Sequence, residues 1–153
     1  MFSLKYGITG FYNRTGTKPP EVDLRIFTEK CYIAARELGG KVLKPTDRNN
    51  HAIMNFSYKT LSVYGKDICI LINNHYPIIS YAIPPVNIGN IDFYECEIIT
   101  KWFDDNSEYY YPGLAILHNP PERFLNELNS AEIEQIKYWK PTNLGDIIFN
   151  FWD

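Results

Sequence analysis

The chain has 153 residues, of which 45% are hydrophobic, 16% aromatic and 22% charged. This composition excludes an intrinsically disordered chain, which has too little apolar surface to offset the entropy lost on folding. The net charge of −3 argues against a general binder of nucleic acids or membrane surfaces. No apolar run approaches the roughly 18 residues of a membrane span, and the first ten residues lack the pattern of a secretory signal.

The first part of the chain predicts one clear helix. Residues 4–9 are expected to form a strand and residues 11–22 a loop. Asp23 can cap a helix that Gly39 and Gly40 end, and a short strand follows over residues 41–44. The helix is predicted by apolar residues that recur every three or four positions: Leu24, Phe27, Cys31, Ala34, Ala35 and Leu38.

An antiparallel meander is expected after a polar loop at residues 46–51. Residues 52–64 are expected to form a strand. Its apolar side chains switch from one face of the strand to the other near residues 59–60, and this change predicts a β-bulge or a bend. The continuous apolar run within residues 67–73 is typical of a central strand covered on both faces. Residues 77–83 supply the next strand.

The segments that follow are expected to be more helical. Residues 84–90 are interpreted as a linker loop and residues 95–103 as a helix. Residues 109–117 predict a strand interrupted by a Pro-Gly pair, and residues 121–129 a short helix.

Two helices are expected to close the chain. The spacing of Asn129 and Glu132 indicates a capping box for a helix over residues 130–139, and Thr142 or Asn143 can cap the last helix. That last helix is predicted by an apolar stripe: Leu144, Ile147, Ile148, Phe151 and Trp152. We therefore expect a single α+β domain over residues 1–153, a mostly antiparallel sheet packed with an early helix and C-terminal helices.

The small net charge hides an uneven distribution. Residues 1–66 carry 11 lysine and arginine residues against five acidic ones, whereas residues 67–153 carry four against 13. One interpretation is that the two halves interleave in space and the acidic residues only keep the surface soluble. The other is an acidic, aromatic surface that docks a basic partner, because tyrosine and tryptophan dominate interface energetics and opposite charges speed encounter.

The densest acidic stretch supplies the candidate partner-binding residues. It contains one basic residue, Lys101, and Trp102 lies beside it. The candidates are Asp92, Glu95, Glu97, Asp104, Asp105, Glu108, Tyr109, Tyr110 and Tyr111.

No motif identifies catalytic residues, a metal site or a cofactor site, and we assign none. Cys31, Cys69 and Cys96 form no C-x-x-C pair, and each lies among apolar residues, as buried cysteines do. Their odd number and apolar context favour reduced thiols and a cytoplasmic protein. The histidines at positions 51, 75 and 118 fit no metal-ligand spacing.

Two other functions stay open from the residues alone. One is a small hydrolase or transferase that uses a pair of cysteine and histidine side chains. The other is a nucleic-acid or regulatory binding module that uses the basic half, with Phe56, Tyr58 and Tyr64 near Lys59 and Lys66. The negative charge of residues 67–153 argues against this second interpretation.

The C-terminal run EIEQIKYWKPTNLGDIIFNFWD, residues 132–153, resembles the ending of small cytoplasmic bacterial immunity proteins encoded beside secreted polymorphic or contact-dependent toxins. Residues 24–42 and 70–79 are also similar, and the three pieces cover one third of the chain. The resemblance implies a protein that binds a cognate toxin domain, a nuclease, in the cytosol and occludes its active site. It carries over no binding residue, and neither a membrane nor a nucleic acid is an expected partner.

Overall fold

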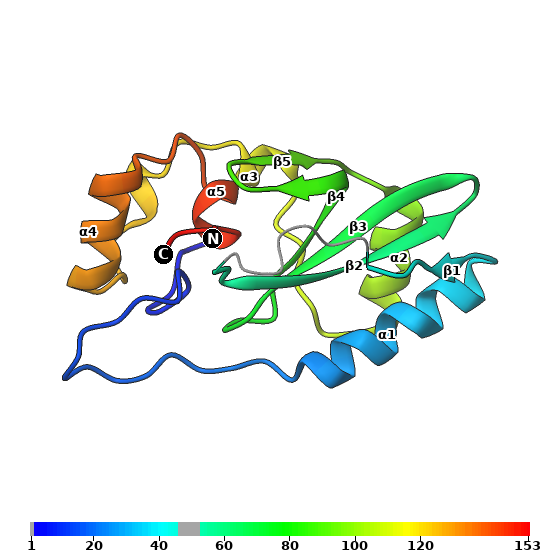
Figure 1. Cartoon of the computed structure of the whole chain (residues 1–153), viewed down its shortest axis with the longest axis horizontal. Coiled ribbons are helices and arrows are strands. Elements are labelled where there is room, and N and C mark those ends of the chain that lie inside the picture. Colours follow the sequence, from blue (N-terminus) through cyan, green and yellow to red (C-terminus); the bar gives the residue numbers. More distant parts are fainter. Residues whose placement is uncertain (1, 46–52) are drawn as a thin grey trace.

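An antiparallel sheet whose strands follow the order of the chain organises the structure (Figure 1). The computed structural model describes residues 2–45 and 53–153. The strands are β1 (Lys41–Val42), β2 (Phe56–Val63), β3 (Lys66–Asn73), β4 (Ile79–Asn87) and β5 (Asn90–Phe93). The predicted meander is therefore confirmed, and β3 is the central strand.

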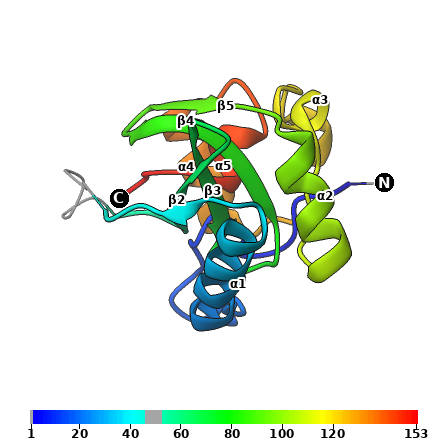
Figure 2. The same cartoon turned by 90° about the vertical axis from the view of Figure 1, so that its right-hand side faces the viewer.

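Helices cover both faces of this sheet, which confirms the α+β class. They are α1 (Leu24–Glu37), α2 (Glu97–Asn106), α3 (Leu114–Leu117), α4 (Ser130–Trp139), α5 (Gly145–Ile148) and a 3-10 turn at Glu122–Phe124. Helices α1 and α2 pack on one face, whereas the N-terminal segment, α3, α5 and the C-terminal segment pack on the other. Figures 1 and 2 show α1 and α2 near one end of the molecule and α4 at the opposite end.

Strand β3 belongs to both hydrophobic cores. Ile68, Ile70 and Ile72 contribute to the core under α1 and α2, while Cys69 and Leu71 contribute to the core under α5. All five side chains are at most 1% exposed. Successive side chains of a strand point to opposite faces of the sheet. Because both faces of β3 are covered, its sequence is continuously apolar.

The β-bulge predicted near residues 59–60 is wrong. Strands β2 and β3 pair without interruption from Phe56 opposite Asn73 to Val63 opposite Lys66. The apolar side chains change face because the strand contributes to both cores. Phe56 packs in the core under α5, whereas Leu61 and Val63 pack in the core under α1 and α2.

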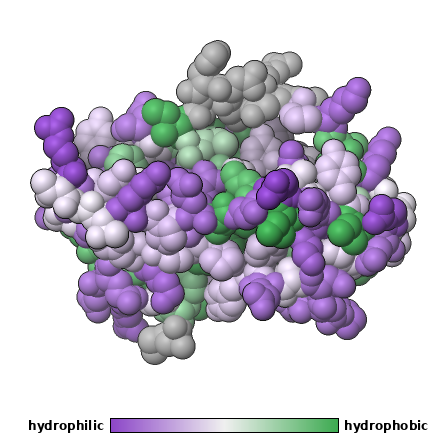
Figure 3. Space-filling model, turned by 90° about the horizontal axis from the view of Figure 1, so that it is seen from below, coloured by the Kyte–Doolittle hydropathy of each residue, from purple (hydrophilic) through white to green (hydrophobic). Residues whose placement is uncertain are grey.

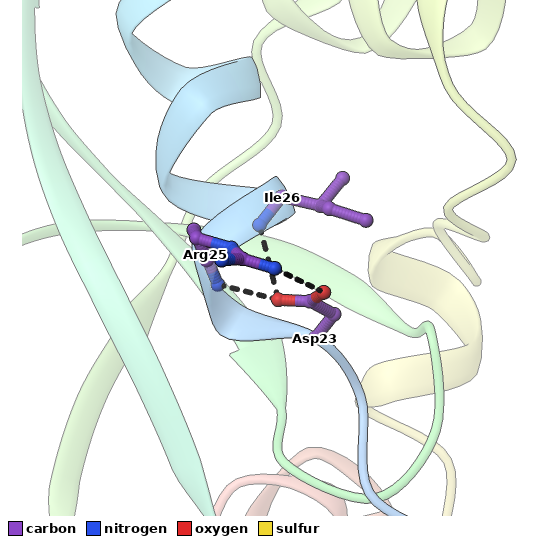
Figure 4. Close-up of polar contacts among 3 residues, drawn as sticks. All are labelled: Asp23, Arg25 and Ile26. Atoms are coloured by element: carbon purple, nitrogen blue, oxygen red, sulfur yellow. Dashed lines mark hydrogen bonds and ion pairs between the residues drawn. The ribbon is translucent and has the colours of Figure 1, made fainter.

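Helix α1 begins and ends as predicted (Figure 4). Asp23 Oδ1 accepts hydrogen bonds from the backbone N–H groups of Arg25 and Ile26, at 3.0 and 3.4 Å. After the helix, Gly40 passes so close to β2 that a Cβ atom there would lie 2.0 Å from the carbonyl oxygen of Ser62. The helix buries Phe27, Cys31, Ala34 and Ala35.

The strand predicted over residues 4–9 is wrong, because this segment forms turns. Gly7 has a φ of +81°, and the backbone N–H groups of Gly7 and Thr9 donate to the carboxylate of Glu132 at 2.7 and 3.0 Å. These donors therefore bind a side chain from α4 instead of a neighbouring strand.

Glu132 also completes the predicted capping box of α4. The Asn129 side chain accepts from the Glu132 backbone N–H at 3.0 Å, and the Glu132 side chain accepts from the Asn129 backbone N–H at 3.2 Å. Glu132 is fully buried. One carboxylate thus caps a helix and holds the N-terminal turn.

The last helix is shorter than predicted: α5 ends at Ile148, Phe149 is extended, and residues 150–153 belong to no helix or strand. Asn143, one of the two expected caps, lies one position before the N-cap Leu144, and its Oδ1 accepts from the Asp146 backbone N–H at 2.9 Å. Beyond Ile148, Asn55 Oδ1 accepts from the Asn150 backbone N–H at 2.7 Å. This bond to the residue that precedes β2 removes the Asn150 backbone N–H from a helical hydrogen-bonding pattern.

Three further predictions are corrected by the structure. Residues 84–90 are not a linker, because β4 continues through Pro84 and Pro85 to Asn87 and turns directly into β5. Residues 109–117 form a single bridge between Tyr110 and Ile78, followed by α3. The helix expected at residues 121–129 is reduced to the 3-10 turn, and the polar loop at residues 46–51 lies outside the described residues.

None of the helices in the described part of the chain combines the length and apolar character needed to traverse a lipid bilayer.

We expect Glu132→Gln to lower the free energy of unfolding by about 2–3 kcal/mol, because an amide nitrogen would face backbone donors that now bind a carboxylate oxygen. Urea unfolding measures this change. Glu134→Gln is the control, because Glu134 is exposed on the same helix, and it should change stability by less than about 0.5 kcal/mol. Equal stability of the two variants would contradict the anchoring role of Glu132.

Candidate protein-binding surface

Helix α2 presents a charged outer face. Glu97, Lys101, Asp104 and Asp105 are exposed and follow the i, i+4, i+7, i+8 spacing that places side chains on one side of a helix. The opposite side buries Ile99, Trp102 and Phe103 in the core under α1. We call the residues Glu97, Asp104 and Asp105 the acidic face of α2.

Contacts with α1 hold this face in a fixed orientation. Trp102 Nε1 donates to Glu37 Oε1 at 2.7 Å, and Lys30 Nζ donates to the carbonyl oxygen of Asn106 at 2.6 Å. Both contacts join the N-terminal half of the chain, residues 1–66, to the acidic C-terminal half. The acidic face therefore lies on a helix packed against the rest of the molecule and not on a loose segment.

The negative charge of this face is compensated only weakly. Lys101 Nζ lies 3.3 Å from Asp105 Oδ2, and both side chains are more than half exposed, so the pair contributes roughly 0.3–0.5 kcal/mol. The other ion pairs among the described residues are Lys18–Glu21 and Arg25–Asp23. None of the three joins the two halves of the chain, so the charges do not interleave as ion pairs in this part of the structure.

The remaining acidic candidates are exposed but lie on other segments. Asp92 is on β5, Glu95 follows β5, and Glu108 follows α2. Glu95 Oε1 accepts a hydrogen bond from the Tyr111 hydroxyl at 3.0 Å. The structure therefore brings Glu95 and Tyr111 together, and it places Glu97, Asp104 and Asp105 on one helix.

The three consecutive tyrosines do not form one exposed patch. The Tyr109 ring packs on Phe27 and Phe103, with ring centroids 6.0 and 6.3 Å apart. The Tyr111 ring packs on Tyr81 at 4.9 Å. Only Tyr110 is largely exposed, at 48%.

Burial keeps the hydroxyl groups of Tyr109 and Tyr111 protonated. Burial is the largest cause, followed by electrostatic interactions with Cys31 and Asp23, and together they raise the pKa of Tyr109 to about 12. The pKa of Tyr111 is also raised, first by burial and then by the hydrogen bond and negative charge of Glu95. The Tyr111 hydroxyl is therefore a neutral donor that fixes the side chain of Glu95.

One apolar residue accompanies the acidic face and was not anticipated from sequence. Ile98 is 48% exposed on α2, between Glu97 and the buried Ile99. An exposed apolar residue surrounded by charges is a common feature of protein interfaces.

Seen from below (Figure 3), the surface is mostly hydrophilic, with apolar patches interrupted by polar residues.

Two of the three cysteines are buried in environments that disfavour a thiolate. Burial raises the pKa of the Cys31 thiol to about 12 and also raises the pKa of Cys69, so neither forms the reactive thiolate at neutral pH. Cys96 is half-buried before α2. In residues 2–45 and 53–153, no group of three or more potential ligands could hold a metal ion.

The described histidines have structural surroundings. The His75 backbone N–H donates to Asn73 Oδ1 at 2.9 Å, and its ring Nδ1 lies 2.8 Å from the Pro20 carbonyl oxygen. His75 therefore lies in a turn, and its ring contacts a different segment. His118 is the residue that follows the last turn of α3.

The aromatic residues of β2 do not form a platform for single-stranded nucleic acid. Phe56 is 1% exposed, and its ring packs edge-on against Phe149 and Phe151 at 5.7 and 5.3 Å. Tyr64 lies beyond the end of β2, in the turn to β3. The C-terminal segment thus covers the sheet face that bases would need for stacking.

No family model, curated protein or solved structure matches this chain.

We predict that iodoacetamide alkylates Cys31 and Cys69 about a hundredfold more slowly in the folded protein than in urea. Burial lowers the fraction of each thiol that is ionised, and only the thiolate reacts. Mass spectrometry of digested samples taken over time at about pH 8 measures each rate. Cys96 is the internal comparison, since it is only half-buried. Rapid modification of Cys31 in the folded state would restore the hydrolase or transferase interpretation.

Proposed function

We propose that this protein is an immunity protein that binds a cognate bacterial toxin domain, a nuclease, in the cytosol and occludes its active site. The proposal combines the resemblance of residues 132–153 to such proteins with the acidic face of α2. The acidic face is the main observation in support of this proposal. Its carboxylates are exposed, they lie on a helix packed against α1, and their negative charge is only weakly compensated.

A nuclease is a suitable partner on electrostatic grounds. An enzyme that binds nucleic acid needs a basic cleft for the phosphates. Exposed carboxylates on a fixed helix are complementary to such a cleft and accelerate encounter with it. Ile98, 48% exposed on the same helix, adds apolar contact area beside the charges.

The competing interpretations have less support. Burial of Cys31 and Cys69 disfavours a cysteine hydrolase or transferase that uses them. Burial of Phe56 disfavours nucleic-acid binding on the sheet. Neither alternative is favoured by a specific group of residues in the described structure.

The decisive experiment is co-expression with the product of the adjacent gene, because immunity proteins are encoded beside their toxins. We expect this protein to restore growth to cells that make the neighbouring protein and to co-purify with it. A neighbour that is not toxic, or toxicity that persists on co-expression, would refute the proposal.

Charge reversal tests the acidic face directly. We predict that Asp104→Lys with Asp105→Lys weakens toxin binding by roughly tenfold or more and flattens its dependence on salt, because the attraction is screened by ions. Calorimetric titration at two or more salt concentrations measures both effects.

The matched control is Glu122→Lys with Glu134→Lys. It changes the net charge equally, and both residues are exposed outside the acidic face. We expect this control to bind nearly as tightly as the unmodified protein. Equal losses in the two double variants would mean that net charge, and not the acidic face, determines binding.

A further inference from the structure

A groove of about 640 Å³ lies at the end of the molecule away from α1. It forms where three segments meet beside α5: the turn from β4 to β5, the end of α4 and the last residues of the chain (Figure 1). Its polar and charged side chains include Asp146, Asp153 and Lys140. Because these segments are distant in sequence, no local pattern predicts the groove.

Two indole rings shape this groove. The rings of Trp139 and Trp152 are parallel within 2°, with centroids 6.4 Å apart. Trp139 is 39% exposed, whereas Trp152 is 7% exposed. The indole N–H of Trp139 donates to Gln135 Oε1 at 2.9 Å. The hydrogen bond therefore holds this partly exposed ring in place.

The C-terminal side of the groove is fixed by buried amides. The Asn150 backbone N–H donates to Asn55 Oδ1, and the Trp152 backbone N–H donates to Asn150 Oδ1 at 3.2 Å. The Asn150 side chain also donates to the Thr9 carbonyl oxygen at 3.2 Å. The groove is thus preformed, which limits the entropy lost when a ligand binds.

Asp146 is half-buried and lines the same groove as the two tryptophans. None of the ion pairs in residues 2–45 and 53–153 involves it. Burial raises its pKa, against smaller opposite effects of a hydrogen bond with Asn143 and the charge of His118. Asn143 therefore satisfies part of the carboxylate, but no described lysine or arginine pairs with it. A partly dehydrated carboxylate of this kind favours a cation that can replace the lost water.

We propose that this groove binds the guanidinium group of an arginine side chain on a protein or peptide partner. A guanidinium ion is planar and weakly hydrated, so it can stack on the Trp139 indole while it donates hydrogen bonds to Asp146. The exposed Asp153 adds a second negative charge, and the two carboxylates outweigh the single charge of the exposed Lys140. An uncharged apolar ligand would remove water from the Asp146 carboxylate without supplying a cation, which is unfavourable.

This inference does not depend on the proposed function. The groove and the acidic face of α2 involve different residues, and a short peptide can test the groove without any toxin. Failure of one proposal is therefore distinguishable from failure of the other.

The test is an NMR titration with a Gly-Gly-Arg-Gly-Gly peptide, acetylated and amidated at its ends, and with the same peptide carrying citrulline or lysine. Citrulline has nearly the shape of arginine but no charge. The readout is the indole N–H signals of the three tryptophans, of which Trp102 lies between α1 and α2 and serves as the internal reference.

We expect the arginine peptide to shift the signals of Trp139 and Trp152 and to leave Trp102 unchanged. The lysine peptide should bind several-fold more weakly, and the citrulline peptide should cause no saturable shift. Equal binding of the arginine and citrulline peptides would overturn the proposal. Equal binding of the lysine peptide would also overturn it, because the site would then recognise charge without guanidinium geometry.

Two variants complete the experiment. Asp146→Asn and Trp139→Leu should each weaken binding of the arginine peptide by about tenfold, because each removes one contact with the guanidinium ion. Asp104→Asn, on the acidic face of α2, is the matched control and should leave peptide binding unchanged. Urea unfolding of each variant checks that the fold is intact, and unaltered binding by a folded Asp146→Asn protein would refute the assignment.

Discussion

The buried carboxylate of Glu132 is the constraint on which the N-terminal side of this fold depends. It accepts hydrogen bonds from Gly7, Thr9 and Asn129, and it has no cationic partner among the described ion pairs. A buried carboxylate is stable only when its oxygen atoms are well hydrogen-bonded. The turn at residues 6–9 therefore has to adopt a conformation that aims backbone N–H groups at α4, and glycine at position 7 permits this with its positive φ.

Buried asparagines join the same N-terminal turn to the C-terminal part of the chain. Asn55 and Asn73 both donate to the carbonyl oxygens of Ile8 and Ile148, so one end of the β2–β3 strand pair holds the N-terminal turn and α5 together. Side-chain amides thus replace strand pairing in a region where neither terminal segment belongs to the sheet. The groove beside α5 owes its fixed shape to these bonds.

Local patterns predicted the elements whose stabilising contacts are local. The Asp23 cap, the capping box at Asn129 and the two-sided strand β3 follow from spacing and apolar content within each segment. The failures at residues 4–9 and at the end of α5 have one cause, since side chains distant in sequence bind the backbone there. The acidic residues of α2 could be predicted from sequence, but the inward packing of Tyr109 and Tyr111 depends on tertiary contacts with Phe27 and Tyr81.

Because β3 belongs to both hydrophobic cores, it determines how the molecule unfolds. Its alternate side chains serve two cores, and the same backbone pairs with β2 and β4. Neither core can open without exposing apolar residues of the common strand, so the cores are energetically coupled despite lying on opposite faces. The chain therefore behaves as one cooperative unit, and strain introduced on the side of one core reaches the other through a single strand.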